Sequence, residues 1–231
     1  MQETLNFGEA EKAMAAKILG AFEKAETTNY FEEKRARHDG CTITLYTSGK
    51  VSIQGSNASR VKDEILAKMN LPRELVIGID ETGRGESTGP MVISGVLADT
   101  NELRQVRDSK KTSDIAKKEK IVSAKMLGSV SVVVNSALID YARNNGKNLN
   151  QIEAGAMEKI AEILSLFGEA RVVADGAPLK VRNKKIIFRP KADDTEPVVG
   201  AASIIAKHAR NNSSDNLERK TWKKNNKNNE Q

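Results

Sequence analysis

Cysteine and histidine are scarce in this chain, and their scarcity excludes several kinds of site. Cys41 is the one cysteine among 231 residues, so neither an internal disulfide nor a zinc site built on several cysteines can form. His38 and His208 are the only histidines, which argues against a catalytic triad and against a histidine-rich metal centre. Acid–base or metal chemistry must therefore rely on aspartate and glutamate.

Long apolar runs are also lacking. No segment approaches the roughly 18 consecutive apolar residues of a membrane-spanning helix. The first residues, MQETLNFGEAEK, carry early acids and lack the charged-then-apolar form of a secretory signal. We therefore expect a cytoplasmic protein without a membrane partner.

The overall composition is that of a folded protein with a modest excess of positive charge. Hydrophobic residues make up 39% of the chain, which suffices for a core, and the formal net charge is +6. Such an excess suits a polyanionic partner such as a nucleic acid. It equally suits simple solubility, and composition does not decide between these two interpretations.

Residues 1–71 predict a small α+β domain. Apolar residues at helical spacing predict a helix over 8–26, and alternating apolar residues predict a two-stranded hairpin over 41–55. A second helix, capped by Asn57 or Ser59, is expected to stop near Asn70, and a linker follows.

Residues 75–210 follow a different pattern, typical of a mixed sheet with helices packed against it. Short apolar segments that indicate buried strands alternate with amphipathic stretches that indicate helices. The expected strands are 76–80, 91–98, 129–134, 171–175 and 185–188, and the expected helices are 149–167 and one that Pro197 opens. The polar residues 211–231 have no apolar face, so we expect a frayed or disordered tail there.

Acidic residues end two of these strands and follow a third. Asp80 ends VIGID, Asp175 ends RVVAD, and Asp193 follows KIIFRPKA. Neighbouring strand ends lie about 5 Å apart, so these acids would converge if their strands were adjacent. Oxygen ligands without histidine favour Mg²⁺ or Mn²⁺, and a pair of such ions can hydrolyse a phosphodiester. Helix capping or ion pairing is an equally good explanation of the acids.

A glycine-rich turn, GRGESTGP, follows Asp80 and Glu81 at once. It lacks the spacing of a P-loop and of a dinucleotide-binding turn. No lysine follows its glycines, so a nucleotide-binding switch is disfavoured. Its glycines would let the backbone approach a ligand closely, for example the ribose 2′-hydroxyl that distinguishes RNA from DNA.

Four segments in order resemble the type 2 ribonucleases H, the ribonuclease HII and HIII group. They are GIDETGRG at 78–85, RDSKKTS at 107–113, VVADG at 172–176 and KADDTEPVVGAASIIAKHAR at 191–210. No single segment is specific, but the combination is. The resemblance implies a ribonuclease H-like fold, a mixed five-stranded sheet flanked by helices, over residues 75–210.

The resemblance also implies an active site. The catalytic, metal-binding acids would be Asp80, Glu81, Asp175 and Asp193, with Mg²⁺ or Mn²⁺ as the cofactor. Asp193 is preferred to Asp194 because its spacing to the Ala-Ala-Ser segment suits the family better. The backbone at Gly83, Arg84 and Gly85 would sense the 2′-hydroxyl, and Ser109, Lys110 and Lys111 would hold phosphates of the duplex.

The subtype stays open. LYTSGKVSIQG at 45–55 resembles the small TATA-box-binding-protein-like domain that precedes ribonuclease HIII, and NLNQIEAGAMEKI at 148–160 is also closer to HIII. GIDETGRG has the HII form, because HIII usually has threonine in place of the arginine. HII also supplies a tyrosine from beyond its Ala-Ala-Ser-Ile helix, whereas no tyrosine follows Tyr141 here, which puts cleavage at single embedded ribonucleotides in doubt.

These features predict a monomeric endoribonuclease. We expect it to hydrolyse the RNA strand of RNA/DNA hybrids by a two-metal-ion mechanism, leaving 5′-phosphate and 3′-hydroxyl ends. A hybrid duplex is the expected partner, and no protein partner is implied. The alternative from another class is a catalytically impaired protein that binds hybrids.

Overall fold

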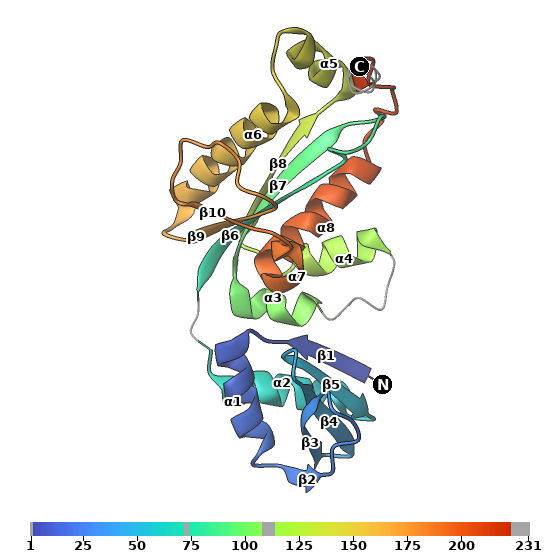
Figure 1. The fold of residues 1–231 in the computed structure, drawn as a ribbon, viewed down its shortest axis with the longest axis vertical. Coiled ribbons are helices and arrows are strands. Elements are labelled where there is room, and N and C mark those ends of the chain that lie inside the picture. Colours follow the sequence, from blue (N-terminus) through green and yellow to red (C-terminus); the bar gives the residue numbers. More distant parts are fainter. Residues whose placement is uncertain (1, 72–73, 108–113, 223–231) are drawn as a thin grey trace. The chain divides into compact units, whose positions relative to one another are not determined.

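Two compact units make up the chain in this computed structural model (Figure 1). The structure describes residues 2–71, 74–107 and 114–222. The first unit comprises Met1–Pro72 and the second Arg73–Gln231. Each unit has a five-stranded sheet of its own, so each is built around its own hydrophobic core.

The first unit is an antiparallel sheet with two helices. Its strand order is β1-β5-β4-β3-β2, and every neighbouring pair is antiparallel. Buried apolar side chains alternate along the central strands β4 and β5, so they lie on one face of the sheet, and this face packs against the helices. The elements are β1 (Gln2–Asn6), α1 (Glu9–Leu19), β2 (Glu23–Ala25), β3 (Glu32–His38), β4 (Cys41–Tyr46), β5 (Lys50–Gly55) and α2 (Ala58–Met69).

This unit has more strands than the predicted hairpin. The hairpin is confirmed as β4 and β5, and α2 stops at Asn70, which adopts a left-handed conformation (φ 42°). Asn57 is the residue that precedes α2, but its side chain does not cap the helix. The predicted helix over 8–26 was wrong beyond Leu19, because residues 23–25 pair with β3 instead.

The second unit contains the predicted mixed five-stranded sheet. Its strand order is β10-β9-β6-β7-β8. β6 is antiparallel to β7 and parallel to β9, and β9 is parallel to β10. The strands are β6 (Leu75–Thr82), β7 (Met91–Asp99), β8 (Gly128–Val134), β9 (Arg171–Asp175) and β10 (Ile186–Arg189). The strand predictions are therefore confirmed, with small differences at their ends.

Helices cover both faces of this sheet (Figure 1). On one side α8 crosses β6 so closely that a side-chain carbon at Gly78 would lie 2.4 Å from the backbone of Val198. On the other side α6 packs against β7 equally closely. A Cβ atom added at Gly95 would lie 2.2 Å from the side chain of Ile160. The helices are α3 (Thr100–Arg107), α4 (Ile115–Ser123), α5 (Ser136–Asn144), α6 (Leu149–Leu164), α7 (Ala192–Thr195) and α8 (Pro197–Asn211).

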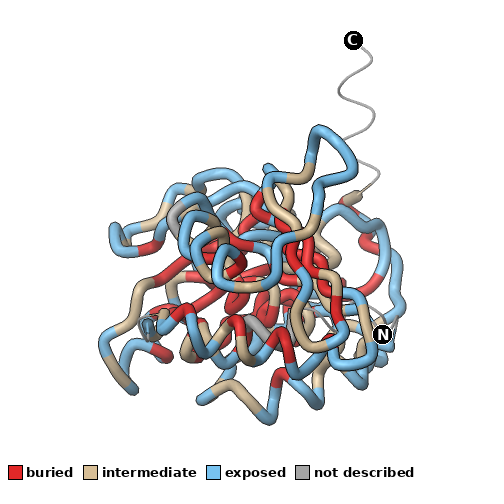
Figure 2. Tube along the Cα trace, turned by 90° about the horizontal axis from the view of Figure 1, so that it is seen from below, coloured by how far each residue is buried: buried red, intermediate tan, exposed pale blue. Residues whose placement is uncertain are grey.

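Burial in the second unit follows the central strands β6 and β7. Figure 2 colours the chain trace by burial, with buried residues in red. All residues of β7 from Met91 to Ala98 are buried. Ile77 and Ile79 of β6 pack in the cluster beneath α6, whereas Val76 packs in the cluster beneath α8. The sheet is thus apolar on both faces, which explains the continuous apolar runs of its strands. None of the helices in the described ranges has the length and apolar character needed to cross a membrane.

The expectation of a disordered tail from residue 211 was wrong for residues 211–222. Asn211 ends α8, and a bridge joins Glu218 to Thr88. Arg219 is completely buried. Polar side chains and backbone groups hold this segment in place, and such contacts leave no apolar pattern in the sequence. Residues 223–231 lie outside the described residues.

Candidate active site

Two acids lie side by side on neighbouring parallel strands: Asp175 ends β9, and Asp80 lies two residues before the end of β6. Ile79 of β6 is in register with Ala174 of β9, so Asp80 and Asp175 occupy the next position of the two strands. Adjacent strands are about 4.8 Å apart. Both acids follow buried apolar residues of their strands, so the fold places the two carboxylates side by side near the C-terminal ends of β6 and β9.

Asp80 is the most strongly perturbed carboxyl of this cluster. Its residue is 5% exposed, and burial, followed by repulsion from Glu81 and Asp175, raises its pKa to about 7. Hydrogen bonds from the Ser203 hydroxyl and from the backbone N–H of Glu81, the latter 2.8 Å long, oppose the rise in pKa. A negative charge here is therefore costly unless a cation accompanies it.

Glu81 and Glu153 extend the acidic cluster toward α6. Burial raises the pKa of Glu81, and the charges of Glu153 and Asp175 raise it further. Burial likewise raises the pKa of Glu153, while Arg84 lowers it. Nε of Arg84 lies 2.8 Å from Oε2 of Glu153 in an ion pair that lacks the alignment of a hydrogen bond. Sequence reasoning missed Glu153, which sits on the buried face of α6 at a position typical of core residues.

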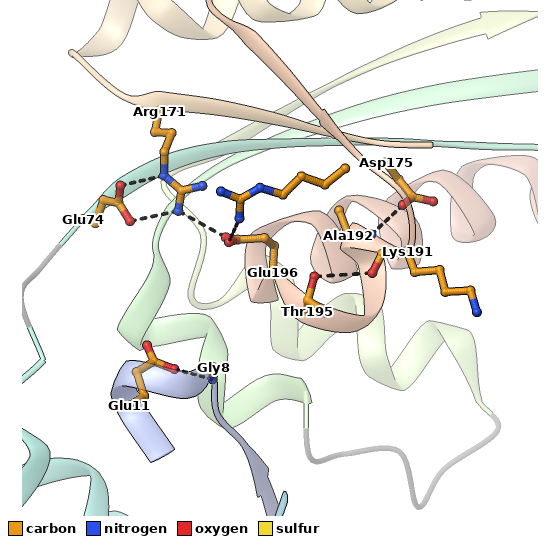
Figure 3. Close-up of polar contacts among 10 residues, drawn as sticks. Gly8, Glu11, Glu74, Arg171, Asp175, Lys191, Ala192, Thr195 and Glu196 are labelled. Carbon is orange, nitrogen blue, oxygen red and sulfur yellow. Dashed lines mark hydrogen bonds and ion pairs between the residues drawn. The ribbon is translucent and has the colours of Figure 1, made fainter. Parts of the chain in front are cut away.

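Asp175 also organises the next helix. Its Oδ1 accepts a hydrogen bond of 2.6 Å from the backbone N–H of Ala192, the first residue of α7 (Figure 3). The helix-capping interpretation therefore holds for Asp175 in addition to its place in the acidic cluster. Asp193 is the next residue of α7 and is partly buried. It is not among the leading causes of the raised pKa values of Asp80, Glu81 and Glu153.

The chemistry of these donors suits a hard divalent cation. Asp80, Glu81 and Asp175 offer carboxylate oxygens only, and their mutual repulsion is what a cation would relieve. Among the described residues, however, no three acidic, histidine or cysteine side chains converge closely enough to form a ready metal site.

The glycine loop, residues 83–89, follows β6 directly. Gly83 has a φ of +77°, and a side-chain carbon there would lie 2.4 Å from Nε of Arg210. Its close approach is thus to the protein itself rather than to a ligand. At Gly85 nothing lies within 4 Å of the corresponding position, so this residue leaves open space. The Arg84 side chain turns to Glu153 and Asn150 on α6.

Two further groups complete the picture of the predicted site. Ser109, Lys110 and Lys111 lie outside the described residues. On α8, Lys207 donates a hydrogen bond of 2.9 Å to the Ser203 hydroxyl, which in turn contacts Asp80. Ser203 and Lys207 are four residues apart, so the sequence AASIIAK already predicts that they lie one helical turn apart on the same face. It does not predict which strand that face contacts.

Family models match both units. A model for ribonuclease HII matches residues 77–229, which is more than half of the chain. A model described as a domain of unknown function, DUF3378, matches residues 15–70.

The chain is similar to curated ribonucleases HII and HIII. It is 37% identical over 153 residues to the ribonuclease HII of Methanobrevibacter smithii, covering 58% of this chain and 72% of that protein. It is 30% identical over 203 residues to the ribonuclease HIII of Protochlamydia amoebophila, covering 75% of this chain and 67% of that protein.

A solved structure supports the fold. The crystal structure of Bst-RNase HIII in complex with Mn²⁺ aligns with a TM-score of 0.55 at 18% identity, covering 91% of this chain and 80% of that chain. Together with the sheet order and the family match, these similarities show that the chain belongs to the ribonuclease HII family of type 2 ribonucleases H, and is a ribonuclease H enzyme.

Proposed function

We propose that this ribonuclease H hydrolyses the RNA strand of RNA/DNA hybrids at the cluster of Asp80, Glu81 and Asp175, with Asp193 completing it from α7. The products would carry 5′-phosphate and 3′-hydroxyl ends. The observation that carries the proposal is the register of β6 and β9, which sets Asp80 beside Asp175. The pKa of about 7 at Asp80 supports it, because strongly perturbed acids are typical of functional sites.

The cofactor in this proposal is Mg²⁺ or Mn²⁺, held by Asp80, Glu81, Asp175 and Asp193. When bound, a pair of such ions would activate the attacking water and stabilise the departing 3′-oxygen. Glu81 and Asp175 both act electrostatically on Asp80, so Asp80 would hold the ions together with these two acids. Ser203 and the backbone N–H of Glu81 would keep the Asp80 carboxylate oriented while its charge is neutralised.

Substrate recognition would rest on the glycine loop. The open space at Gly85 gives a ribose 2′-hydroxyl room to approach the backbone of Gly83, Arg84 and Gly85. Ser109, Lys110 and Lys111 would contact phosphates, which position a duplex without reading its sequence.

The first unit would bind the same duplex, as a TATA-box-binding-protein-like domain. Its basic and acidic residues balance in number, so the net charge of +6 resides in the second unit. Exposed aromatic side chains are therefore its better candidates for contact. Tyr30 is 90% and Phe31 66% exposed, with ring centroids 5.5 Å apart, and such rings can stack on nucleotides.

A cleavage assay tests the proposal. Labelled RNA/DNA hybrid, RNA/RNA duplex and DNA/DNA duplex of one sequence are incubated with Mg²⁺, with Mn²⁺ and with EDTA. We expect cleavage of the hybrid alone, only with a divalent ion, and 5′-phosphate ends on the products. Cleavage in EDTA, or 3′-phosphate products, would refute the mechanism.

A second substrate addresses the subtype. A DNA duplex with one embedded ribonucleotide is compared with the continuous hybrid. The ratio of the two cleavage rates decides between an HII-like and an HIII-like preference. The binding-only alternative is not favoured, because the relatives that show the family are ribonucleases. We further propose that the protein acts as a monomer in the cytoplasm.

A further inference from the structure

The segment after α8 returns to the glycine loop and pairs with it. We call residues 213–222 the C-terminal strap. The backbone N–H of Arg219 donates to the carbonyl of Ser87 at 2.8 Å, and the N–H of Gly89 donates to the carbonyl of Leu217 at 2.9 Å. A bridge joins Thr88 to Glu218. The strap thus runs as a short antiparallel partner of the far end of the loop.

The Arg219 side chain spans the loop from one end to the other. Its guanidinium donates from Nη2 to the carbonyl of Gly83 at 2.7 Å, from Nη1 to that of Arg84 at 3.3 Å, and from Nε to that of Gly89 at 2.9 Å. Arg219 is 0% exposed. One planar, rigid group therefore binds three carbonyls of the loop. The carbonyl of Gly83 also accepts a hydrogen bond of 3.3 Å from the backbone N–H of Glu86.

Two acids of α5 and the strap fasten this arrangement. Asp215 of the strap accepts from the backbone N–H of Ser136 at 2.6 Å and from its hydroxyl at 2.9 Å. Asp140 of α5 accepts from the backbone N–H groups of Lys220 and Thr221 at 2.8 and 2.9 Å. The strap is consequently held on both sides of Arg219. The backbone of Arg219 is therefore fixed in position, and so is the guanidinium that binds the loop.

A completely buried arginine is an unfavourable residue for a contact that is only structural. Taking a guanidinium out of water is unfavourable, and burial, followed by repulsion from Arg210, lowers its pKa. Its three hydrogen bonds end on backbone carbonyls, which an apolar side chain with good packing would not require. What the arginine supplies is a defined orientation of those peptide groups.

That orientation decides where the loop's N–H groups point. The peptide bonds of the described residues are trans, and a trans peptide directs its C=O and its N–H to opposite sides. Because the carbonyls of Gly83 and Arg84 turn toward Arg219, the N–H groups of Arg84 and Gly85 turn away from it. Gly85 has open space at its side-chain position, so a substrate oxygen has room there.

We propose that Arg219 is a positioning residue for substrate recognition, which acts by fixing the carbonyls of the glycine loop so that the N–H groups of Arg84 and Gly85 face the ribose of the RNA strand. This inference rests on the proposed function of the loop in hybrid recognition. It assigns the C-terminal strap a role in telling a hybrid from a DNA duplex, although Arg219 itself does not touch the substrate.

The test compares Arg219→Met and Arg219→Lys with the wild-type full chain. Affinities for RNA/DNA hybrid and DNA/DNA duplex are measured in EDTA, where no turnover occurs, and KM and kcat for the hybrid are measured with Mg²⁺. We expect Arg219→Met to lower the preference for hybrid over DNA by about tenfold, the effect of one or two misplaced hydrogen bonds. Arg219→Lys keeps the charge without the planar fork, and we expect an intermediate loss.

Arg171→Met is the matched control. Arg171 pairs with Glu74 and Glu196 at the other end of the sheet (Figure 3), so its loss costs ion pairs without touching the loop. We expect it to lower the unfolding temperature and leave the hybrid preference unchanged. An equal loss of preference in this control would overturn the proposal, because general loosening would then explain the effect.

Other outcomes separate this inference from the proposed function. If the wild type prefers hybrid and folded Arg219 variants keep that preference, the positioning role is refuted and the function stands. If both Arg219 variants fail to fold, Arg219 supports the whole unit rather than the loop, and the inference is likewise refuted. If the wild type neither prefers nor cleaves hybrid, the proposed function itself fails.

Discussion

Arg84 of the glycine loop and Glu153 of α6 form an ion pair, with Nε and Oε2 2.8 Å apart. The glutamate is 4% exposed, whereas the arginine side chain is 40% exposed. The pair joins the loop to the acidic cluster, since Glu153 raises the pKa of Glu81 and Arg84 lowers it. The arginine of the loop therefore serves first as a counter-charge within the site.

Removal of Arg84 should destabilise the protein in a pH-dependent way. In Arg84→Met the buried carboxyl of Glu153 loses the charge that lowers its pKa, so stability falls as the pH rises through the raised folded-state pKa. We expect a loss of about 1–3 kcal/mol at pH 8 and a smaller loss at pH 5, measured by urea unfolding. Adding Glu153→Gln should restore part of the stability at pH 8. Equal losses at both pH values would speak against this account.

Asp80 should lower the free energy of unfolding of the metal-free protein at high pH. Its folded-state pKa of about 7 is above the ordinary value of 3.8, so the folded state retains a proton that the unfolded state releases. Its contribution is most favourable below pH 4 and is lost between pH 4 and 7. We expect Asp80→Asn to stabilise the protein in EDTA by up to about 4 kcal/mol at pH 8 and to have little effect at pH 4. Thermal unfolding at both pH values measures this, and destabilisation at pH 8 would contradict it.

Gly83 and Gly85 should respond differently to the same substitution. Gly83→Ala meets a positive φ and a contact of 2.5 Å with the Pro90 carbonyl, so we expect a loss of about 1–3 kcal/mol in unfolding free energy. Gly85→Ala enters open space, and we expect it to keep stability while lowering hybrid affinity. Unfolding curves and a gel-shift titration with hybrid separate the two effects. Loss of stability in Gly85→Ala with hybrid affinity intact would be the opposite of this expectation.

The exposed aromatic pair of the first unit offers a test of its role in binding. Replacing Tyr30 and Phe31 by alanine should leave the unit folded, because both rings are exposed. Stacking on nucleotides contributes about 1–3 kcal/mol for each ring, so we expect the loss of both rings to lower hybrid affinity at least about thirtyfold with kcat unchanged. Met14→Ala, which also replaces an exposed apolar side chain of this unit, serves as the control. Unchanged affinity in the double variant would remove these residues from the interface.

Apolar patterning allowed prediction of the second unit's sheet because its central strands β6, β7 and β9 are buried on both faces. VIGID and RVVAD read as strands that end in acids, and their parallel register then placed Asp80 beside Asp175. The strand β3 (Glu32–His38), which lies between β4 and β2, was missed because Ala36 is its only fully buried residue. Its charged residues do not form an apolar pattern.

The supporting contacts of the site could not be predicted in the same way. Glu153 and Arg219 contact the loop although they lie 69 or more residues from Arg84 along the chain. Neither residue stands out in the local sequence pattern. Glu153 occupies a position typical of the core, whereas Arg219 lies in a polar stretch that resembled a solvated tail. Contacts of this kind depend on tertiary packing, which the local sequence does not encode.

The most direct test of the acidic cluster is the activity of Asp80→Asn. Asparagine keeps the shape of the side chain but removes the charge that a divalent ion would need. We predict that cleavage of RNA/DNA hybrid falls at least about a hundredfold, while hybrid affinity measured in EDTA stays within about threefold of the wild type. Cleavage at the wild-type rate by a folded Asp80→Asn protein would contradict the central claim.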